Sequence, residues 1–350
     1  MNLEFDGNIQ PVYTFYNHHK LSTALNELEQ NSQDRVKVDQ IGLSNQGRPI
    51  WRAKVGKGKK AVLASSYIHG NEPTGATVLL NLLRFLGLSE APLAKRLRNE
   101  LTFVAVPMAN PDAVELNRHN NVMTWEQVVK HYPDLAEVVP PFHYKPENDS
   151  DPAGFNVNLD FRSNLDYTPS LDDFPFHAGW YLTPEARVLA AVYKQLQIEF
   201  GKVDTYLDLH NQNADNAETD RVQETGEQAL LSISGVMINE PHATIEYSKQ
   251  LTLIAYDALI EHGYNRITRF PELHAPMTSL GAFAQNGSGV VLFEALHSSN
   301  LERETYESII KSEETAVLAV LEAIASGSVQ SIDPHTYDRI PKGTLDPSKV

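Results

Sequence analysis

The chain has 350 residues, of which 41% are hydrophobic and 21% are charged, and these proportions are typical of a globular protein. The formal net charge of −16 argues against nucleic acid and anionic membrane surfaces as partners. No apolar stretch is long enough to span a bilayer and no secretory signal is visible, so we expect no membrane association and a cytoplasmic location. The absence of cysteine excludes disulfides, thiolate metal ligands and a cysteine nucleophile. Any zinc must therefore be held by His, Asp or Glu.

Strand-like and helix-like segments alternate along the chain, which predicts an α/β fold with a mixed, mostly parallel sheet and helices on both faces. In chain order the predicted elements are helix 20–30, strands 36–43, 50–55 and 61–68, helix 74–88, strand 101–106, helix 183–200, strand 203–209, helix 243–262, strand 289–293 and helix 302–325. Turn-forming residues at 44–49 join the first two strands. Thr183-Pro184-Glu185 has the composition of a helix start.

Two stretches interrupt the alternation. Residues 125–151 contain several prolines and acids, and we expect a long surface excursion with a short helix near Trp125. Residues 326–350 are polar and contain prolines, which predicts a loosely packed C-terminal tail. The sequence therefore predicts one domain, residues 1–325, followed by this tail.

Side chains that can bind a metal stand at the carboxyl ends of three predicted strands. His69 and Glu72 follow the third strand, His210 follows the fifth and Glu294 follows the last. Open α/β sheets build their sites at this edge. Two histidines and one glutamate satisfy the three-ligand count of a hydrolytic zinc site, and a second glutamate can accept the proton of a metal-bound water.

A His-x-x-Glu pattern by itself is weak evidence, since roughly one such match in ten binds a metal. A second histidine at a strand end strengthens the prediction considerably. His119 and His297 lie close to the candidate segments, and their roles stay open.

Five motifs occur in order along the chain. They are the hairpin 42–50 (Gly-Leu-Ser-Asn-Gln-Gly-Arg-Pro-Ile), the segment 69–75 (His-Gly-Asn-Glu-Pro-Thr-Gly), the turn Asn110-Pro111-Asp112, the strand end Asp208-Leu209-His210 and the pair Phe293-Glu294. This set resembles the zinc carboxypeptidases related to carboxypeptidase A, the M14 metallopeptidases. The resemblance runs from about residue 36 to residue 325, nearly the whole chain.

The resemblance implies a role for each matching residue. His69, Glu72 and His210 would bind Zn²⁺, which lowers the pKa of a bound water toward neutrality. Glu294 would act as general base and then return the proton to the leaving amine. Arg118 matches the family arginine that polarises the scissile carbonyl and stabilises the oxyanion, a role that suits a permanent cation.

The chain departs from the family pattern where the substrate carboxylate should be held. Asn158 matches the asparagine of the family's Asn-Arg pair, but Leu159 stands in place of the arginine, and leucine cannot make a bidentate contact with a carboxylate. Arg162, three residues later, is our candidate replacement. Asn156 stands where the family has an aspartate that orients a zinc-binding histidine, so we expect a different second coordination shell.

The substrate-facing tyrosine of the family has two candidate counterparts, Tyr264 and His274. Both precede the segment 278–283, which resembles the pocket wall before the catalytic glutamate. We prefer Tyr264 slightly. Ser279 and its neighbours offer no acid for a basic C-terminal side chain, which disfavours a lysine- or arginine-specific enzyme.

The function that the resemblance implies is hydrolysis of a C-terminal amide bond in a peptide or peptide-like substrate. One alternative is an amidohydrolase of the aspartoacylase and succinylglutamate desuccinylase type, which cleaves N-acyl amino acids. The long stretch between Glu72 and His210 and the lack of an evident β-domain after Glu294 favour the carboxypeptidase. A second alternative is a non-catalytic peptide-binding relative, which retention of Glu294 and all three ligands disfavours. The sequence carries no signal for oligomeric state.

Overall fold

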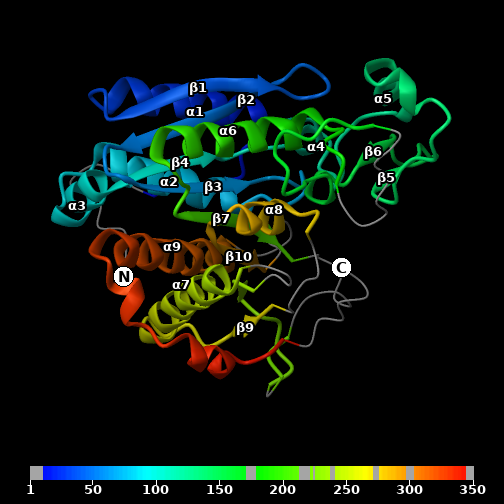
Figure 1. The fold of residues 1–350 in the computed structure, drawn as a ribbon. Helices are drawn as coiled ribbons and strands as arrows, with labels where there is room; N and C mark the ends of the chain where they lie inside the picture. Colours follow the sequence, from blue (N-terminus) through cyan, green and yellow to red (C-terminus); the bar gives the residue numbers. More distant parts are fainter. Residues whose placement is uncertain are drawn as a thin grey trace.

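The protein is described by a computed structural model that covers residues 11–170, 179–212, 221–223, 225–236, 241–270, 276–296 and 303–343. An eight-stranded mixed sheet with helices on both faces dominates this part of the chain, as the sequence predicts (Figure 1). His274 and His297 fall outside the described residues.

The main sheet has the strand order β1-β2-β4-β3-β7-β10-β8-β9. The bounds are β1 Val36–Leu43, β2 Pro49–Gly56, β3 Lys60–Ser66, β4 Leu101–Val106, β7 Thr205–Asn211, β8 Leu231–Ser234, β9 Ile267–Arg269 and β10 Gly289–Ala295. The four central strands, β4, β3, β7 and β10, are parallel to one another. Their carboxyl ends therefore meet at one edge of the sheet. A separate two-stranded sheet pairs β5 (Tyr144–Lys145) with β6 (Gly154–Phe155).

Helices connect and cover these strands. The bounds are α1 His18–Asn31, α2 Thr74–Leu88, α3 Pro92–Glu100, α4 Pro111–Glu115, α5 Trp125–His131, α6 Pro184–Phe200, α7 His242–Glu261, α8 Ser279–Gln285 and α9 Arg303–Ser326. Short 3₁₀ segments lie at η1 Pro133–Leu135, η2 Val157–Leu159, η3 Ser328–Ser331 and η4 Pro334–Arg339. The start of α6 is as predicted: the Thr183 side chain accepts from the Ala186 N–H, and Pro184 opens the helix.

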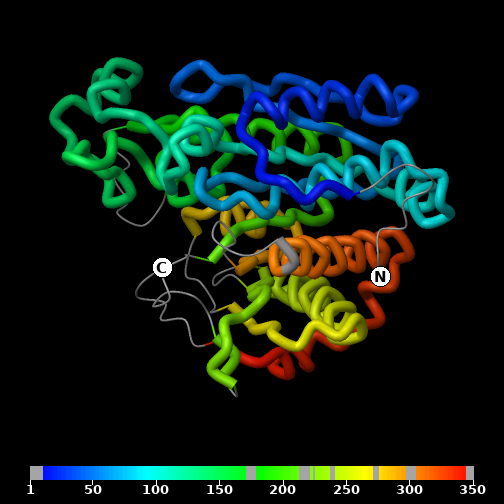
Figure 2. The backbone as a smooth tube through the Cα atoms, turned by 180° about the vertical axis from the view of Figure 1, so that it is seen from behind, coloured from blue at the N-terminus to red at the C-terminus, as the bar shows by residue number. Residues whose placement is uncertain are grey.

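Two apolar clusters form on the two faces of the sheet. On one face, helices α1, α2, α3, α7 and α9 pack against inward residues such as Val62 and Leu207. On the other face, α6 and α8 pack against Leu63 and Tyr206. Successive residues of a strand thus point to opposite faces of the sheet, and helices cover both faces. This explains why β3 is a continuous apolar run in the sequence. Figure 2 shows α9 and α7 side by side on the first of these faces.

The excursion predicted at 125–151 carries α5 and a small apolar cluster of its own. Thr124 and Gln127 form a capping box at the start of α5. Val128 and Leu135 from the excursion pack with residues outside it, including Phe155. This packing attaches the excursion to the segment that follows it.

The loosely packed tail expected after residue 325 is wrong for residues 328–340. Both 3₁₀ segments lie there, and Val329, Tyr337 and Ile340 are buried in the main cluster. The two 3₁₀ segments have only four and six residues, too few for a periodic pattern in the sequence.

Seven helices and strands of the described chain were not predicted: α3, α4, α8, β5, β6, β8 and β9. β8 and β9 have only four and three residues, too few for a periodic signal. No single helix in the described part of the chain is long and apolar enough to span a membrane; α2 and α3 pass that test only as a pair bent by 97°.

Candidate active site

Three neighbouring parallel strands bring the predicted metal ligands and the predicted base to one edge. His69 and Glu72 follow β3, and His210 is the sixth residue of β7. Glu294 lies on β10 directly opposite His210 in the parallel register, and it is half-buried. The three strand ends singled out in the sequence therefore meet in space.

The two oxygens of Glu72 face one histidine each. The Nδ1 atom of His69 lies 2.9 Å from Oε1, and the Nδ1 atom of His210 lies 2.8 Å from Oε2. These three side chains are buried, and the two rings are tilted by 57° with centroids 5.0 Å apart. Two imidazole nitrogens and a carboxylate thus converge, which is a donor set that fits one zinc ion.

A polar side chain faces the opposite nitrogen of each ring. His69 Nε2 is hydrogen-bonded to the Asn156 amide oxygen at 3.1 Å, whereas His210 Nε2 lies at ion-pair distance, 3.2 Å, from an oxygen of Asp208 without the geometry of a hydrogen bond. When Nε2 carries the hydrogen, Nδ1 presents its lone pair to the metal position. Asn156 therefore takes the place of the family aspartate with its amide oxygen.

Asp208 is fixed by two hydroxyls besides its histidine. The Ser65 hydroxyl donates to one carboxylate oxygen at 2.9 Å, and the Ser279 hydroxyl donates to the other at 2.6 Å. The sequence reasoning assigned no role to Asp208. Its position two residues before His210, hence on the same face of β7, was the signal available.

The charges of this cluster are strongly coupled. Burial alone would raise the pKa of Glu72, but His69 and His210 hold it well below its ordinary value. Burial alone would lower the pKa of His210, but Asp208 and Glu72 hold it well above. The carboxylates of Glu72 and Asp208 thus stabilise a positive charge on His210, and a bound cation would take the place of that charge.

A third histidine lies beside this cluster. The ring of His119 stacks on His69, with centroids 3.6 Å apart and planes 18° apart. One of its ring nitrogens lies within 4.8 Å of a ring nitrogen of His69 and of a carboxylate oxygen of Glu72. The sequence placed His119 near the site without a role.

The Asn110-Pro111-Asp112 turn fixes the end of β3 just before His69. The Asn110 N–H donates to the Tyr67 carbonyl at 2.9 Å, and its side-chain amide donates to the Ile68 carbonyl at 3.0 Å. Tyr67 has φ of 53°, a left-handed conformation that costs a tyrosine free energy and that these bonds hold in place.

Asp112 joins this turn to the β1–β2 hairpin. Its oxygens accept from the Ser44 hydroxyl at 2.7 Å, the Gln46 N–H at 2.8 Å and the Arg48 guanidinium at 2.6 Å. The carboxylate is fully buried, so these donors replace the water it has lost. Two motifs that are 60 residues apart in sequence form one unit.

Arg118 lies behind the same turn with donors to spare. Nη2 is 3.2 Å from an oxygen of Asp151, while Nε and Nη1 are buried and make no hydrogen bond in the described structure. A Cβ at Gly154 would lie 1.9 Å from the Asn121 carbonyl oxygen and 3.3 Å from Nη2. The Asn121 carbonyl therefore leaves room only for glycine at this position beside the guanidinium.

Comparison with known proteins agrees with this geometry. The family model for zinc carboxypeptidases, peptidase family M14, matches residues 21–214, more than half of the chain. The chain belongs to the zinc carboxypeptidase family.

Curated relatives resemble only part of the chain. Cytosolic carboxypeptidase 6 of Mus musculus is 27% identical over 131 residues, which cover 35% of this chain and 23% of the relative. Cytosolic carboxypeptidase 2 of Homo sapiens is 35% identical over 79 residues, which cover 23% of this chain and 9% of the relative. The match therefore spans less than a quarter of the length of either relative.

Solved carboxypeptidases share the fold of the chain. Thrombin activatable fibrinolysis inhibitor has a TM-score of 0.63 at 14% identity, over 91% of this chain and 76% of that one. Carboxypeptidase A from Helicoverpa armigera has a TM-score of 0.63 at 15% identity, over 92% and 78%. At these identities the likeness shows the zinc carboxypeptidase fold.

Of the substrate residues predicted by family resemblance, Asn158 lies in the network of the metal centre. Its amide oxygen accepts from the Ser279 N–H at 3.3 Å and the Ser279 hydroxyl at 3.2 Å, and that hydroxyl also bonds Asp208. Leu159, beside it, is half-buried. The guanidinium of Arg162 lies 3.8 Å from the Tyr167 ring centroid, and its substrate role stays a prediction.

The contacts of Tyr264 do not support its predicted role. Its side chain packs against the main apolar cluster and hydrogen-bonds Thr315 of α9. Burial raises the pKa of its hydroxyl. The described contacts of Tyr264 are thus packing contacts, and its substrate role stays a prediction.

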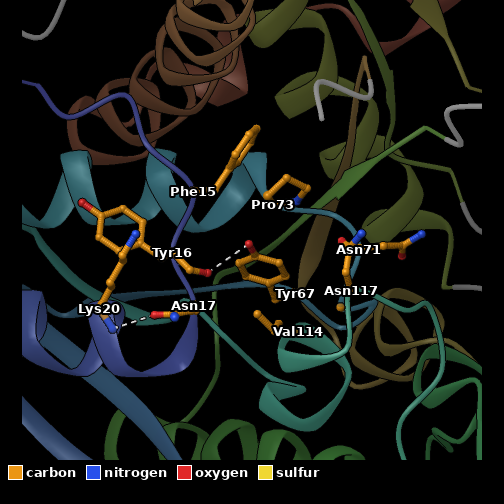
Figure 3. A pocket seen from close by; sticks show the side chains of 10 residues that line it. Phe15, Tyr16, Asn17, Lys20, Tyr67, Asn71, Pro73, Val114 and Asn117 are labelled. Carbon is orange, nitrogen blue, oxygen red and sulfur yellow. Dashed lines mark hydrogen bonds between the residues drawn. The ribbon is translucent and has the colours of Figure 1, made fainter. Parts of the chain in front are cut away.

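A pocket of about 250 Å³ lies beside the turn that carries His69 and Glu72 (Figure 3). Its wall consists of Phe15, Tyr16, Asn17, Lys20, Tyr67, Gly70, Asn71, Pro73, Val114 and Asn117. The first four come from the segment that precedes the family match, and the Tyr67 hydroxyl donates to the Tyr16 carbonyl at 3.2 Å. This N-terminal segment therefore builds part of the surface next to the metal ligands.

Proposed function

We propose that the chain is a zinc-dependent carboxypeptidase that hydrolyses the C-terminal amide bond of a peptide or peptide-like substrate. The observation that carries the proposal is the convergence of His69 Nδ1 and His210 Nδ1 on the two oxygens of Glu72, with Glu294 opposite His210. A cytoplasmic location stays a prediction, and the names of the curated relatives agree with it.

The mechanism assigns the hydrolytic steps to residues of this chain. His69, Glu72 and His210 would hold the zinc ion, which when bound supplies a water acidic enough to lose a proton near neutral pH. Glu294 takes that proton and later donates it to the leaving amine. Arg118 donates hydrogen bonds to the scissile carbonyl oxygen as negative charge develops there, using donors that have no other partner in the described structure.

The substrate test uses three classes of compound: blocked dipeptides with a free carboxylate, the same dipeptides amidated at the C-terminus, and N-acyl amino acids. We expect the free-acid dipeptides to be cleaved fastest, and we expect activity to disappear with a chelator and return with zinc. Preferential cleavage of N-acyl amino acids would favour the amidohydrolase instead. Equal cleavage of amidated and free-acid peptides would show that nothing replaces the arginine missing at Leu159.

Glu294→Gln separates binding from catalysis. The amide cannot accept a proton, so we expect turnover to fall by at least about 100-fold while metal content by mass spectrometry stays at the wild-type value. Wild-type turnover by this variant would remove Glu294 from the mechanism. Tight peptide binding by a wild-type protein that binds zinc but cleaves none of these compounds would favour the non-catalytic alternative.

A further inference from the structure

More side chains of metal-binding type gather at the strand edge than the three that a catalytic zinc site needs. His69 and Glu72 belong to either possible set, so the third ligand could be His210 or His119. Distance favours His119, whose ligand atom lies within 4.8 Å of those of both His69 and Glu72, whereas the close approach of His210 is to Glu72, at 2.8 Å. The orientation of the rings decides.

The stacked arrangement prevents His69 and His119 from binding the same ion. A nitrogen lone pair lies in the plane of its ring, so a bound metal also lies close to that plane. The two planes are only 18° apart and the centroids are 3.6 Å apart. A metal in the plane of His69 would therefore lie well out of the plane of His119.

His210 has the geometry that His119 lacks. Its ring is tilted by 57° to that of His69, so the planes of the two rings intersect. Its Nδ1 faces the oxygen of Glu72 that His69 leaves open. Its other nitrogen is supported by Asp208. One ion can lie in both ring planes only for this pair.

We propose that His119 is a positioning residue of the metal centre: its ring is a platform that fixes the plane of the ligand His69. This inference rests on the proposed zinc site. The Nδ1 atom of His119 is 3.0 Å from the Asn120 side-chain oxygen, a contact that limits rotation of the platform. His119 is exposed while His69 is only 7% exposed, so the platform also separates the ligand from solvent. His69 is then held by Asn156 at its edge and by His119 on its face.

The proposal depends on the face of the ring and not on its nitrogens, so phenylalanine should replace histidine. Cobalt(II) titration of the apoprotein measures the metal affinity and the visible absorption bands, which report the geometry around the ion. We expect His119→Ala to weaken cobalt binding roughly 10-fold and to change the bands, as loss of support for a ligand does. We expect His119→Phe to stay within about threefold of wild type, with the wild-type bands. His210→Ala should lose tight binding altogether.

His131→Ala is the matched control, because it removes another exposed histidine that is outside the cluster. If His119→Phe is as defective as His119→Ala, the nitrogen is required and the platform role is overturned. Wild-type cobalt binding by His119→Ala, or tight binding by His210→Ala, would also overturn it. These readouts use metal binding alone. A wild-type protein that binds cobalt but cleaves no peptide would contradict the proposed activity while the spectra still decide the role of His119.

Discussion

At the scale of single residues, the two candidate histidine ligands differ in the side chain that faces Nε2, the nitrogen opposite the metal position. His210 is supported by the buried carboxylate of Asp208, whereas His69 is supported by the neutral amide of Asn156. A carboxylate makes an imidazole a stronger ligand than an amide does, because it stabilises positive charge on the ring. The two candidate ligands are therefore unequal: the charge of Asp208, at ion-pair distance but without hydrogen-bond geometry, gives His210 the stronger electrostatic support.

Replacement of Asp208 by asparagine tests this inequality. The change keeps the size of the side chain but removes the charge behind His210, so we expect zinc affinity to fall by about 10- to 100-fold. Competition with a chelating dye measures the affinity, and Asn156→Ala measures the support of His69 for comparison. A smaller effect for Asp208→Asn than for Asn156→Ala would show that the inequality is reversed.

The sequence singled out the candidate metal ligands because they stand at or shortly after the ends of strongly apolar strands. It did not predict His119 as the partner of His69, because a ring stack between residues 50 positions apart leaves no local pattern. For Tyr264, family position slightly favoured a substrate contact, whereas its described contacts are with the main apolar cluster and with Thr315 of α9. The direction of such a side chain depends on packing between distant segments, which no local sequence pattern shows.

At the scale of elements, the segment that carries Arg118 is fastened by the start of α6. Glu185 accepts from the Asn121 side-chain amide at 3.0 Å and from the Asn45 N–H at 3.1 Å. Asn121 in turn exchanges two hydrogen bonds with Phe155, of 2.8 and 3.0 Å. A helix start, a hairpin turn and the segment beside Gly154 thus share one buried carboxyl group.

This carboxyl group makes stability depend on pH. Burial raises the pKa of Glu185 from 4.5 to about 7, with a smaller contribution from Asp112. Between pH 4.5 and 7 the folded chain keeps a proton that the unfolded chain has lost, so rising pH lowers the free energy of unfolding. A shift of this size corresponds to roughly 3 kcal/mol over that window.

Glu185→Gln removes this dependence. We expect the unfolding free energy of the variant, relative to wild type, to rise by up to about 3 kcal/mol between pH 5 and pH 8, whatever the constant loss from its altered hydrogen bonds. Urea unfolding of both proteins at the two pH values measures the change. Parallel pH dependence of the two proteins would show that Glu185 is ionised throughout.

At the scale of the whole molecule, the sheet and its two covering layers followed from the sequence, while the segment after α9 did not. Continuous apolar runs indicate the central strands, and the helical period of apolar residues indicates the helices. The central elements were therefore predicted within a few residues. Ile340 and Tyr337 enter the core from short 3₁₀ turns, which have no such period. The core extends beyond the domain boundary that composition indicated.

Ile340→Ala tests this extension of the core. Ile340 is fully buried in the main cluster, so truncation should lower the free energy of unfolding by about 2–5 kcal/mol. His335→Ala, an exposed position on the same 3₁₀ segment, is the control and should change it by less than about 0.5 kcal/mol. Equal stability of both variants in urea unfolding would contradict the packing of residues 328–340 in the core and would favour a loosely packed tail.

The buried carboxylate of Asp112 has a consequence for how the two turns change among related sequences. One side chain satisfies Ser44, Gln46 and Arg48 of the hairpin, and its neighbour Asn110 holds the strand end before His69. In a hairpin taken from a distant relative, the hydrogen-bond donors would not match the position of the Asp112 carboxylate. The two turns should therefore covary among relatives, and a chimaera should exchange them together.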